Sequence, residues 1–136
     1  MDAKVKLMKA RDKRVRPGLD DKGLTAWNAL MLKGYVDAYK AFGKEAYLKT
    51  AINNANFIVS EMLQSDNRLH RNYKDGKSVI NAFLDDYALT AEAFIALYQV
   101  TFDEKWLLTA KDLVDYATTH FFDAESGMYN LSLIHI

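Results

Sequence analysis

The hydrophobic pattern of residues 24–42 predicts a helix that is apolar on two sides. One stripe at helical spacing comprises Leu24, Trp27, Met31, Tyr35, Ala38 and Phe42, and a second comprises Ala29, Leu32, Val36 and Tyr39. A helix with two apolar stripes needs packing partners on both sides. Residues 84–102 follow the same pattern, because the polar residues in the body of that helix are only Thr90, Glu92 and Gln99.

Each two-sided helix is followed by a helix with one apolar face. Residues 44–64 and the segment that begins at Asp103 both alternate apolar and polar positions as a surface helix does. Gly43 is predicted to cap the first two-sided helix. A shorter helix is predicted near residues 1–13, because Pro17 and Gly18 prevent it from continuing.

A small β-hairpin is predicted in the loop before the second two-sided helix. Its arms are residues 68–73 and 78–80, joined through Asp75-Gly76. An Asp-Gly pair between short alternating segments is a strong hairpin signal.

The sequence repeats itself at a spacing of 59 residues. Ala38-Tyr39, Tyr47-Leu48 and Thr50-Ala51 match Leu97-Tyr98, Trp106-Leu107 and Thr109-Ala110 at that offset. A repeat of this length is typical of stacked or circularly arranged helical hairpins. We therefore predict an all-α fold of α/α hairpins, in which the two-sided helices form the inner wall of a ring and the one-sided helices its outer wall.

Loop lengths predict where a binding site would lie. The turns at Gly43 and Asp103 are short, whereas the loops into the inner helices, residues 13–23 and 65–82, are long. The long loops and the N-termini of the inner helices should therefore gather at one rim, and binding residues tend to sit on such loops. The 59-residue register places Trp27 and Asp86 on this rim.

Two Leu-Asp-Asp triplets before the inner helices supply the candidate catalytic residues, which are Asp20, Asp21, Asp85 and Asp86. One carboxylate from each triplet could flank a glycosidic bond, one as general acid and the other as base or nucleophile. Each pair also has a structural interpretation, because aspartate is favoured at helix starts, where the helix dipole stabilises a carboxylate. The sequence leaves both interpretations open.

The candidate substrate-binding residues are Arg16, Trp27, Asn28 and Tyr87. The two aromatic rings could stack on the apolar face of a sugar, and the polar side chains could bond its hydroxyl groups. Aromatic residues at helical spacing are more often part of a core. For Trp27 the two interpretations are balanced, whereas Trp106, on an outer helix, is predicted to lie in the core.

The remaining ionisable residues suggest no metal or cofactor site. Glu92, in the body of the second inner helix, faces either a polar lumen or a charged neighbour. The spacing of His70, His120 and His135 suits no metal site, and we expect ordinary surface histidines. The sequence contains no phosphate loop and no dinucleotide-binding fingerprint, so we expect no cofactor.

Composition excludes several classes of function. Eighteen basic and eighteen acidic residues cancel, which argues against a dedicated nucleic-acid binder. The absence of cysteine excludes disulfides, thiolate catalysis and cysteine-based zinc or iron–sulfur sites. The sequence shows no signal peptide and no apolar run long enough to cross a bilayer, so we expect no membrane partner and a cytoplasmic location.

Several runs resemble the helical part of the DUF255 family of thioredoxin domain-containing proteins. The most specific are residues 13–22, 24–28, 73–77 and 82–88, and the similarity extends from about Lys6 to Tyr129. The resemblance implies a thioredoxin-like domain followed by an (α/α)6 toroid of the six-hairpin glycosidase type, related to N-acylglucosamine 2-epimerases.

The resemblance also implies that this chain is a fragment of such a toroid. It has no thioredoxin-like domain, and two hairpins cannot close a ring of six. We expect residues 1–130 to form a partial toroid of two hairpins preceded by an outer helix, and residues 131–136 to be an unrelated or disordered tail. Exposed apolar faces on the inner helices should make the fragment self-associate.

For function, the resemblance implies a carbohydrate ligand in the mouth of the toroid. The parent protein would be glycosidase-like or sugar epimerase-like, and the fragment alone would be inactive. The alternative is a non-catalytic scaffold or sugar-sensing module, in which the aspartates are helix caps.

Overall fold

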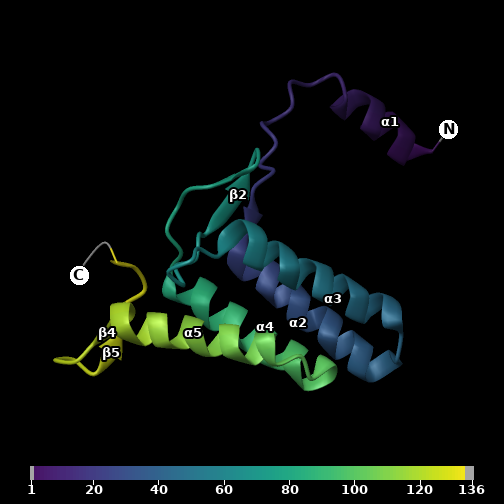
Figure 1. Cartoon of the computed structure of the whole chain (residues 1–136). Coiled ribbons are helices and arrows are strands. Elements are labelled where there is room, and N and C mark those ends of the chain that lie inside the picture. Colours follow the sequence, from purple (N-terminus) through teal and green to yellow (C-terminus); the bar gives the residue numbers. More distant parts are fainter. Residues whose placement is uncertain (1, 134–136) are drawn as a thin grey trace.

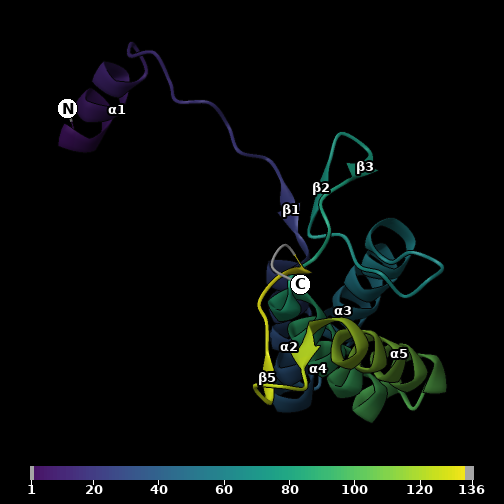
Figure 2. The same cartoon turned by 90° about the vertical axis from the view of Figure 1, so that its left-hand side faces the viewer.

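Two helical hairpins lie side by side in the computed structural model, which describes residues 2–133 (Figures 1 and 2). Its helices are α1 (Ala3–Arg11), α2 (Thr25–Phe42), α3 (Glu45–Phe57), a π-helical turn that continues α3 (Ile58–Met62), α4 (Leu84–Thr101) and α5 (Glu104–Phe121). The predicted α/α hairpins are confirmed. His135 lies outside the described residues.

The inner helices α2 and α4 run parallel and pack against each other in the register of the sequence repeat. At one end the Ala26 amide donates a hydrogen bond of 3.0 Å to Asp86 Oδ1. Near the other end Lys40 Nζ donates a 3.2 Å hydrogen bond to Gln99 Oε1, at a separation of 59 residues. The predicted common rim is therefore formed by the N-termini of α2 and α4.

The core lies between the four long helices and below the rim. Each outer helix buries one face, and Trp106 of α5 is only 2% exposed, which confirms its predicted place in the core. The second predicted stripe of α2 is buried through Ala29, Leu32 and Val36. The first stripe is not, because Trp27 and Met31 are more than half exposed. Within the described chain, α2 thus packs against α3 and α4, and its face with Trp27 and Met31 has no covering helix.

A three-stranded antiparallel sheet covers the rim in the order β1 (Gly23–Leu24), β2 (Asn72–Lys74) and β3 (Lys77–Ser78). The predicted turn is confirmed, because Asp75 and Gly76 both have positive φ, as a type I′ turn requires. The strands are shorter than the predicted arms. Sequence did not predict β1, because two residues are too few to show a periodic pattern.

A second hairpin, β4 (Phe122–Asp123) with β5 (Met128–Tyr129), follows α5 and was also not predicted. The chain then returns to the rim, where Leu131 O accepts a 2.9 Å hydrogen bond from the Leu84 amide. Leu133 packs against the core. As far as it is described, the segment predicted as a tail therefore contacts the helices.

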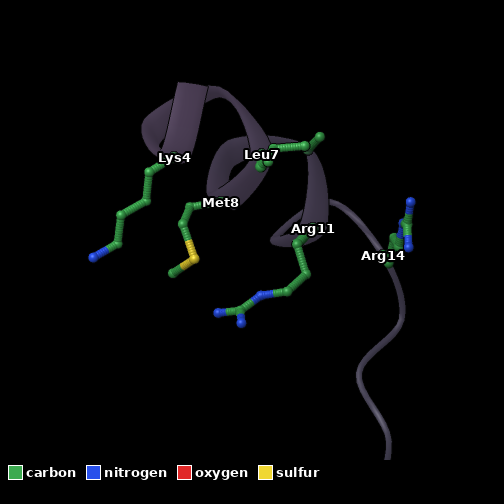
Figure 3. A pocket seen from close by; sticks show the side chains of 6 residues that line it. Lys4, Leu7, Met8, Arg11 and Arg14 are labelled. Carbon is green, nitrogen blue, oxygen red and sulfur yellow. The ribbon is translucent and has the colours of Figure 1, made fainter. Parts of the chain in front are cut away.

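Helix α1 and the extended residues that follow it stand apart from the two hairpins (Figures 1 and 2). No residue of α1 is buried. Lys4, Met8 and Arg11 point to the same side of the helix, and no other element faces them (Figure 3). The hollow beside α1 is therefore open surface. None of the described helices combines the length and apolar character needed to cross a membrane.

The two inner helices end in the same way at equivalent positions of the repeat. Gly43 and Phe102 both adopt left-handed backbone conformations, with φ of 63° and 55°. Each amide donates a 2.8 Å hydrogen bond to the carbonyl four residues earlier, on Tyr39 and Tyr98. The predicted cap at Gly43 is confirmed. A phenylalanine with positive φ is strained, because its Cβ approaches the following carbonyl.

We predict that Phe102→Gly raises the free energy of unfolding by about 1 kcal/mol by relieving this strain. The Phe102 side chain is 79% exposed, so its loss removes little packing. Equilibrium denaturation at fixed protein concentration measures the change. Phe102→Ala is the matched control, because it removes the ring but retains the Cβ. Equal stabilities of the two variants would contradict the strain.

Candidate functional site

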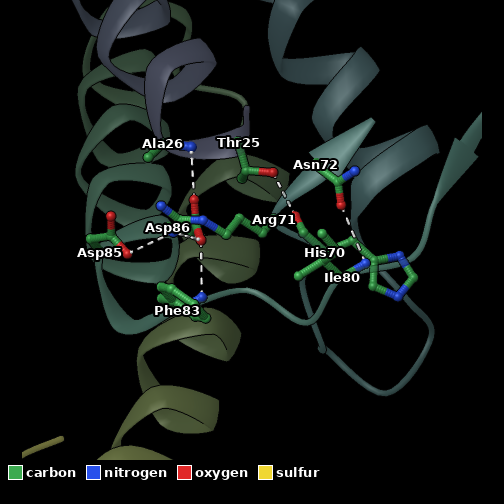
Figure 4. Close-up of polar contacts among 9 residues, drawn as sticks. All are labelled: Thr25, Ala26, His70, Arg71, Asn72, Ile80, Phe83, Asp85 and Asp86. Atoms are coloured by element: carbon green, nitrogen blue, oxygen red, sulfur yellow. Dashed lines mark hydrogen bonds and ion pairs between the residues drawn. The ribbon is translucent and has the colours of Figure 1, made fainter. Parts of the chain in front are cut away.

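One carboxylate joins the N-termini of both inner helices. Asp86 Oδ1 accepts a 3.0 Å hydrogen bond from the amide of Ala26, in the first turn of α2. Its Oδ2 accepts a 2.9 Å hydrogen bond from the amide of Phe83, which precedes α4. These amides are among the donors that a helix start leaves unsatisfied. Asp86 therefore caps two helices at once (Figure 4).

Arg71 completes the environment of Asp86 from the loop before β2. Its Nη1 lies 2.9 Å from Asp86 Oδ2 and 3.2 Å from Asp85 Oδ1. Its guanidinium carbon lies 4.3 Å from the centre of the Phe83 ring, in a cation–π contact. Its carbonyl accepts a 2.9 Å hydrogen bond from the Thr25 amide. Arg71 thus connects the loop to both helix starts.

The two aspartates of this triplet have different environments. Asp86 is fully buried, whereas the side chain of Asp85 is 42% exposed. Burial raises the pKa of Asp86, and the charge of the neighbouring Asp85 adds to that rise. The hydrogen bonds from the Phe83 and Ala26 amides and the positive charge of Arg71 oppose it. No part of the Asp86 carboxylate is exposed in the described chain, and its catalytic role stays a prediction. Its capping interpretation is the one that the geometry supports.

Tyr87 also has a structural position. It is 2% exposed, its hydroxyl accepts a 2.8 Å hydrogen bond from the Leu69 amide, and its ring stacks on Tyr116 at 5.2 Å between centroids. Burial raises the pKa of its phenol. The ring has almost no free surface in the described chain, and the stacking of Tyr87 on a sugar stays a prediction.

Trp27 is the accessible aromatic residue at the rim. It lies in the first turn of α2 and is 69% exposed, so the core interpretation of this residue is wrong. The neighbouring Asn28 is half-buried, and its side-chain amide donates a 2.8 Å hydrogen bond to Leu24 O. The exposed ring of Trp27 can therefore meet a ligand, while the Asn28 amide helps to hold the start of α2.

The first aspartate pair, Asp20 and Asp21, does not take part in the contacts that Asp86 and Arg71 make at the helix starts. Asp20 and Asp21 are in the extended segment before β1 and are exposed. They pair with Lys22 at 3.0 Å and with Lys74 at 2.6 Å, and these lysines lower the pKa of both carboxyls. Neither aspartate caps α2, which begins at Thr25, so the capping interpretation is wrong for this pair.

The remaining predicted polar residues lie on the surface. Arg16 is in the same extended segment as Asp20 and pairs with Asp12. Glu92 has a charged neighbour, Lys33, whose Nζ is 3.9 Å from Glu92 Oε1. His70 is half-buried against Gln64, and burial lowers its pKa. Among residues 2–133 no three histidine or acidic side chains are grouped so that they could hold a metal ion.

Sequence reasoning missed Arg71 as a rim residue. Arg71 lies in a predicted hairpin arm, and no helical or strand periodicity relates it to Asp85. The structure leaves three groups at the rim that a ligand can reach: the Trp27 ring, the Asp85 carboxylate and the Arg71 guanidinium, whose side chain is 27% exposed. The first offers an aromatic face, and the paired Asp85 and Arg71 offer a hydrogen-bond acceptor and a charged donor.

Sequence comparison shows that this chain is similar to parts of longer proteins. No family model matches the chain. It is 33% identical over 133 residues to spermatogenesis-associated protein 20 of Homo sapiens, and 32% identical over 130 residues to an uncharacterized protein of Caenorhabditis elegans. The alignments cover 91% and 90% of this chain but only 17% and 18% of those proteins. The chain is thus similar to one segment of much longer proteins.

Solved structures with the same helical arrangement include proteins named as carbohydrate enzymes. A GH76 α-mannanase from Bacteroides thetaiotaomicron matches with a TM-score of 0.77 and 22% identity, over 86% of this chain and 33% of that one. Cellobiose 2-epimerase from Bacillus thermoamylovorans matches with a TM-score of 0.74 and 23% identity, over 87% and 31%. The fold is that of an (α/α)6 toroid fragment. At these identities the similarity establishes the fold alone.

We predict that Asp86→Asn lowers the free energy of unfolding by about 2 kcal/mol, because asparagine replaces one acceptor oxygen with a donor and leaves a buried amide unpaired. Asp85→Asn is the matched control and should cost less than about 1 kcal/mol, since its ion pair is partly exposed. Urea denaturation followed by circular dichroism measures both. Equal losses in the two variants would contradict the double cap.

Proposed function

We propose that the chain is a fragment of the helical toroid of a thioredoxin domain-containing protein of the DUF255 family. The support is its 33% identity to spermatogenesis-associated protein 20 over nearly the whole chain, together with the specific runs at residues 13–22 and 82–88. Under this proposal, the complete protein also contains a thioredoxin-like domain and the other hairpins of the toroid.

We further propose that the rim binds a carbohydrate. The observation that carries this proposal is that the exposed Trp27 ring and the Arg71–Asp85 pair lie at the same end of the molecule, where both inner helices begin. An aromatic ring can cover the apolar face of a pyranose, while a guanidinium and a carboxylate bond its hydroxyl groups. The structural neighbours include proteins named as a mannanase, a cellobiose 2-epimerase and a D-mannose isomerase.

If the complete toroid is catalytic, Asp85 is the acid–base candidate within this segment. It is the accessible aspartate of the second triplet, and its Oδ1 lies 3.2 Å from Arg71 Nη1. A glycosidase-like or epimerase-like mechanism needs a second group. Asp20 and Asp21 stay candidates for that role, although both are paired with lysines.

A non-catalytic scaffold or sugar-sensing role is the second candidate. It is favoured by the full burial of Asp86 and by its three hydrogen bonds to Ala26, Phe83 and Arg71. These contacts explain the second Leu-Asp-Asp triplet through fold stability alone, without any need for a reaction.

We predict that mannose and cellobiose change the fluorescence of Trp27 and raise the melting temperature of the protein, with dissociation constants on the order of millimolar. The chain has two tryptophans, and Trp106 is buried. Trp106→Phe should therefore retain the fluorescence response, and Trp27→Phe should abolish it and weaken the thermal shift. Glycerol serves as a polyol control.

Two outcomes would count against carbohydrate binding at the rim. One is the absence of any sugar-dependent shift. The other is a shift that Trp27→Phe leaves unchanged, which would place the ligand elsewhere. If the sugars bind, the affinities of the Asp85→Asn and Arg71→Lys variants measure what each side chain contributes to binding.

A further inference from the structure

Thr90 carries a buried hydroxyl group that has no partner among the described residues. Its side chain lies in the body of α4 and is fully buried, and its Oγ1 atom makes no hydrogen bond there. Such atoms are rare in proteins, because a buried polar group without a partner costs free energy. The position of Thr90 therefore needs a physical explanation.

A second buried polar group lies one turn earlier on the same face of α4. Asp86 and Thr90 are four residues apart, and side chains at this spacing are neighbours on a helix. Both residues are fully buried. A charged carboxylate can only accept hydrogen bonds, whereas the acid form has one O–H group to donate. The Thr90 hydroxyl oxygen is an acceptor for that O–H group.

The charged form of Asp86 is bonded to donors (Figure 4). The Ala26 amide donates to Oδ1, and the Phe83 amide and Arg71 Nη1 donate to Oδ2. Hydrogen bonds to a charged acceptor are about twice as strong as those to a neutral one, so protonation weakens all of these bonds. The new O–H group also needs an acceptor, and none of these donors provides one.

Asp86 takes up a proton more readily than an ordinary aspartate does. Burial raises its pKa, and the charge of Asp85 adds to the rise. The Phe83 and Ala26 amides and the charge of Arg71 reduce the rise without cancelling it. Because the pKa is higher in the folded chain than in the unfolded chain, protonation of Asp86 favours the folded state. This proton uptake therefore does not by itself cause unfolding.

The charged groups that act on Asp86 come from two elements. Arg71 lies in the loop before β2, and Asp85 lies on α4 itself. Helix α2 faces Asp86 with the Ala26 amide, which does not titrate. His70, next to Arg71, has its ring against Gln64, and burial lowers its pKa. This histidine also titrates in the acid range, so an experiment has to separate it from Asp86.

We propose that Asp86 is an acid-operated switch, in which the protonated carboxyl group donates to Thr90 Oγ1 and loosens its bonds to α2 and Arg71. Arg71 then pairs with Asp85, at the part of the rim that a ligand can reach. The start of α2 loses its charged cap. Acid thus loosens the rim while the helices stay folded. The switch rests on these contacts and not on the carbohydrate proposal.

An NMR titration of the whole chain from neutral to mildly acidic pH tests the switch. The amide shifts of Ala26 and Phe83 report the charge of the carboxylate that they bond, and circular dichroism verifies that the helices stay folded. Both amides should shift together, with a midpoint above the ordinary aspartate range. Amide shifts that stay constant until the helices unfold would overturn the proposal.

Three variants assign the transition to its groups. Thr90→Val removes the acceptor and should lower the midpoint by about one pH unit, because the acid form loses a hydrogen bond. Asp85→Asn should lower it by up to about one unit, because it removes a neighbouring negative charge. Asp86→Asn should abolish the transition. An unchanged midpoint in Thr90→Val would overturn the pairing of Asp86 with Thr90.

His70→Gln is the control for the second group that titrates in the acid range. It should leave the Ala26 transition and its midpoint in place. Loss of the transition in His70→Gln would assign it to the histidine and overturn the proposal. If Asp86→Asn does not fold, the midpoints of Thr90→Val and Asp85→Asn still decide, and a midpoint that neither variant lowers overturns the proposal.

Discussion

The arrangement of the two hairpins depends on the buried carboxylate of Asp86. It accepts hydrogen bonds from the first turn of α2, from the residue before α4 and from the loop that carries Arg71. Each of these donors would be costly to bury without an acceptor. One side chain therefore fixes the relative height of the inner helices and the position of the loop above them, which sets the shape of the rim.

The sequence predicted those features that arise from periodic patterns. The apolar stripes determined the long helices, and the 59-residue repeat placed Trp27 and Asp86 on the same rim, as the contact between Ala26 and Asp86 shows. The Asp75-Gly76 pair determined its turn by local backbone preference. In each case the signal is local or repeats at a fixed spacing, and such signals can be read without knowing the tertiary contacts.

The details of the site could not be predicted, because they depend on non-periodic contacts. Adjacent aspartates carry the same local signal, yet Asp86 is buried and Asp85 reaches solvent. Only the packing of α2 against α4 decides between them. Arg71 reaches both from a loop whose path no pattern specifies. The two hairpins also carry different residues at one equivalent position of the repeat, which is Trp27 in the first and Asp86 in the second. Asp86 is buried and holds the helices together, whereas Trp27 is exposed.

The alternating direction of the helices gives the rim a radial electric field. The inner helices α2 and α4 begin there, whereas the outer helices α3, through its π-helical turn, and α5 end there. Helix N-termini carry partial positive charge and C-termini partial negative charge. A negatively charged group at the starts of the inner helices is therefore stabilised by about 0.3–1 kcal/mol per helix end. Asp86 places its carboxylate at both of these ends, so the helix dipoles favour the charged form of a carboxyl group that burial alone would neutralise.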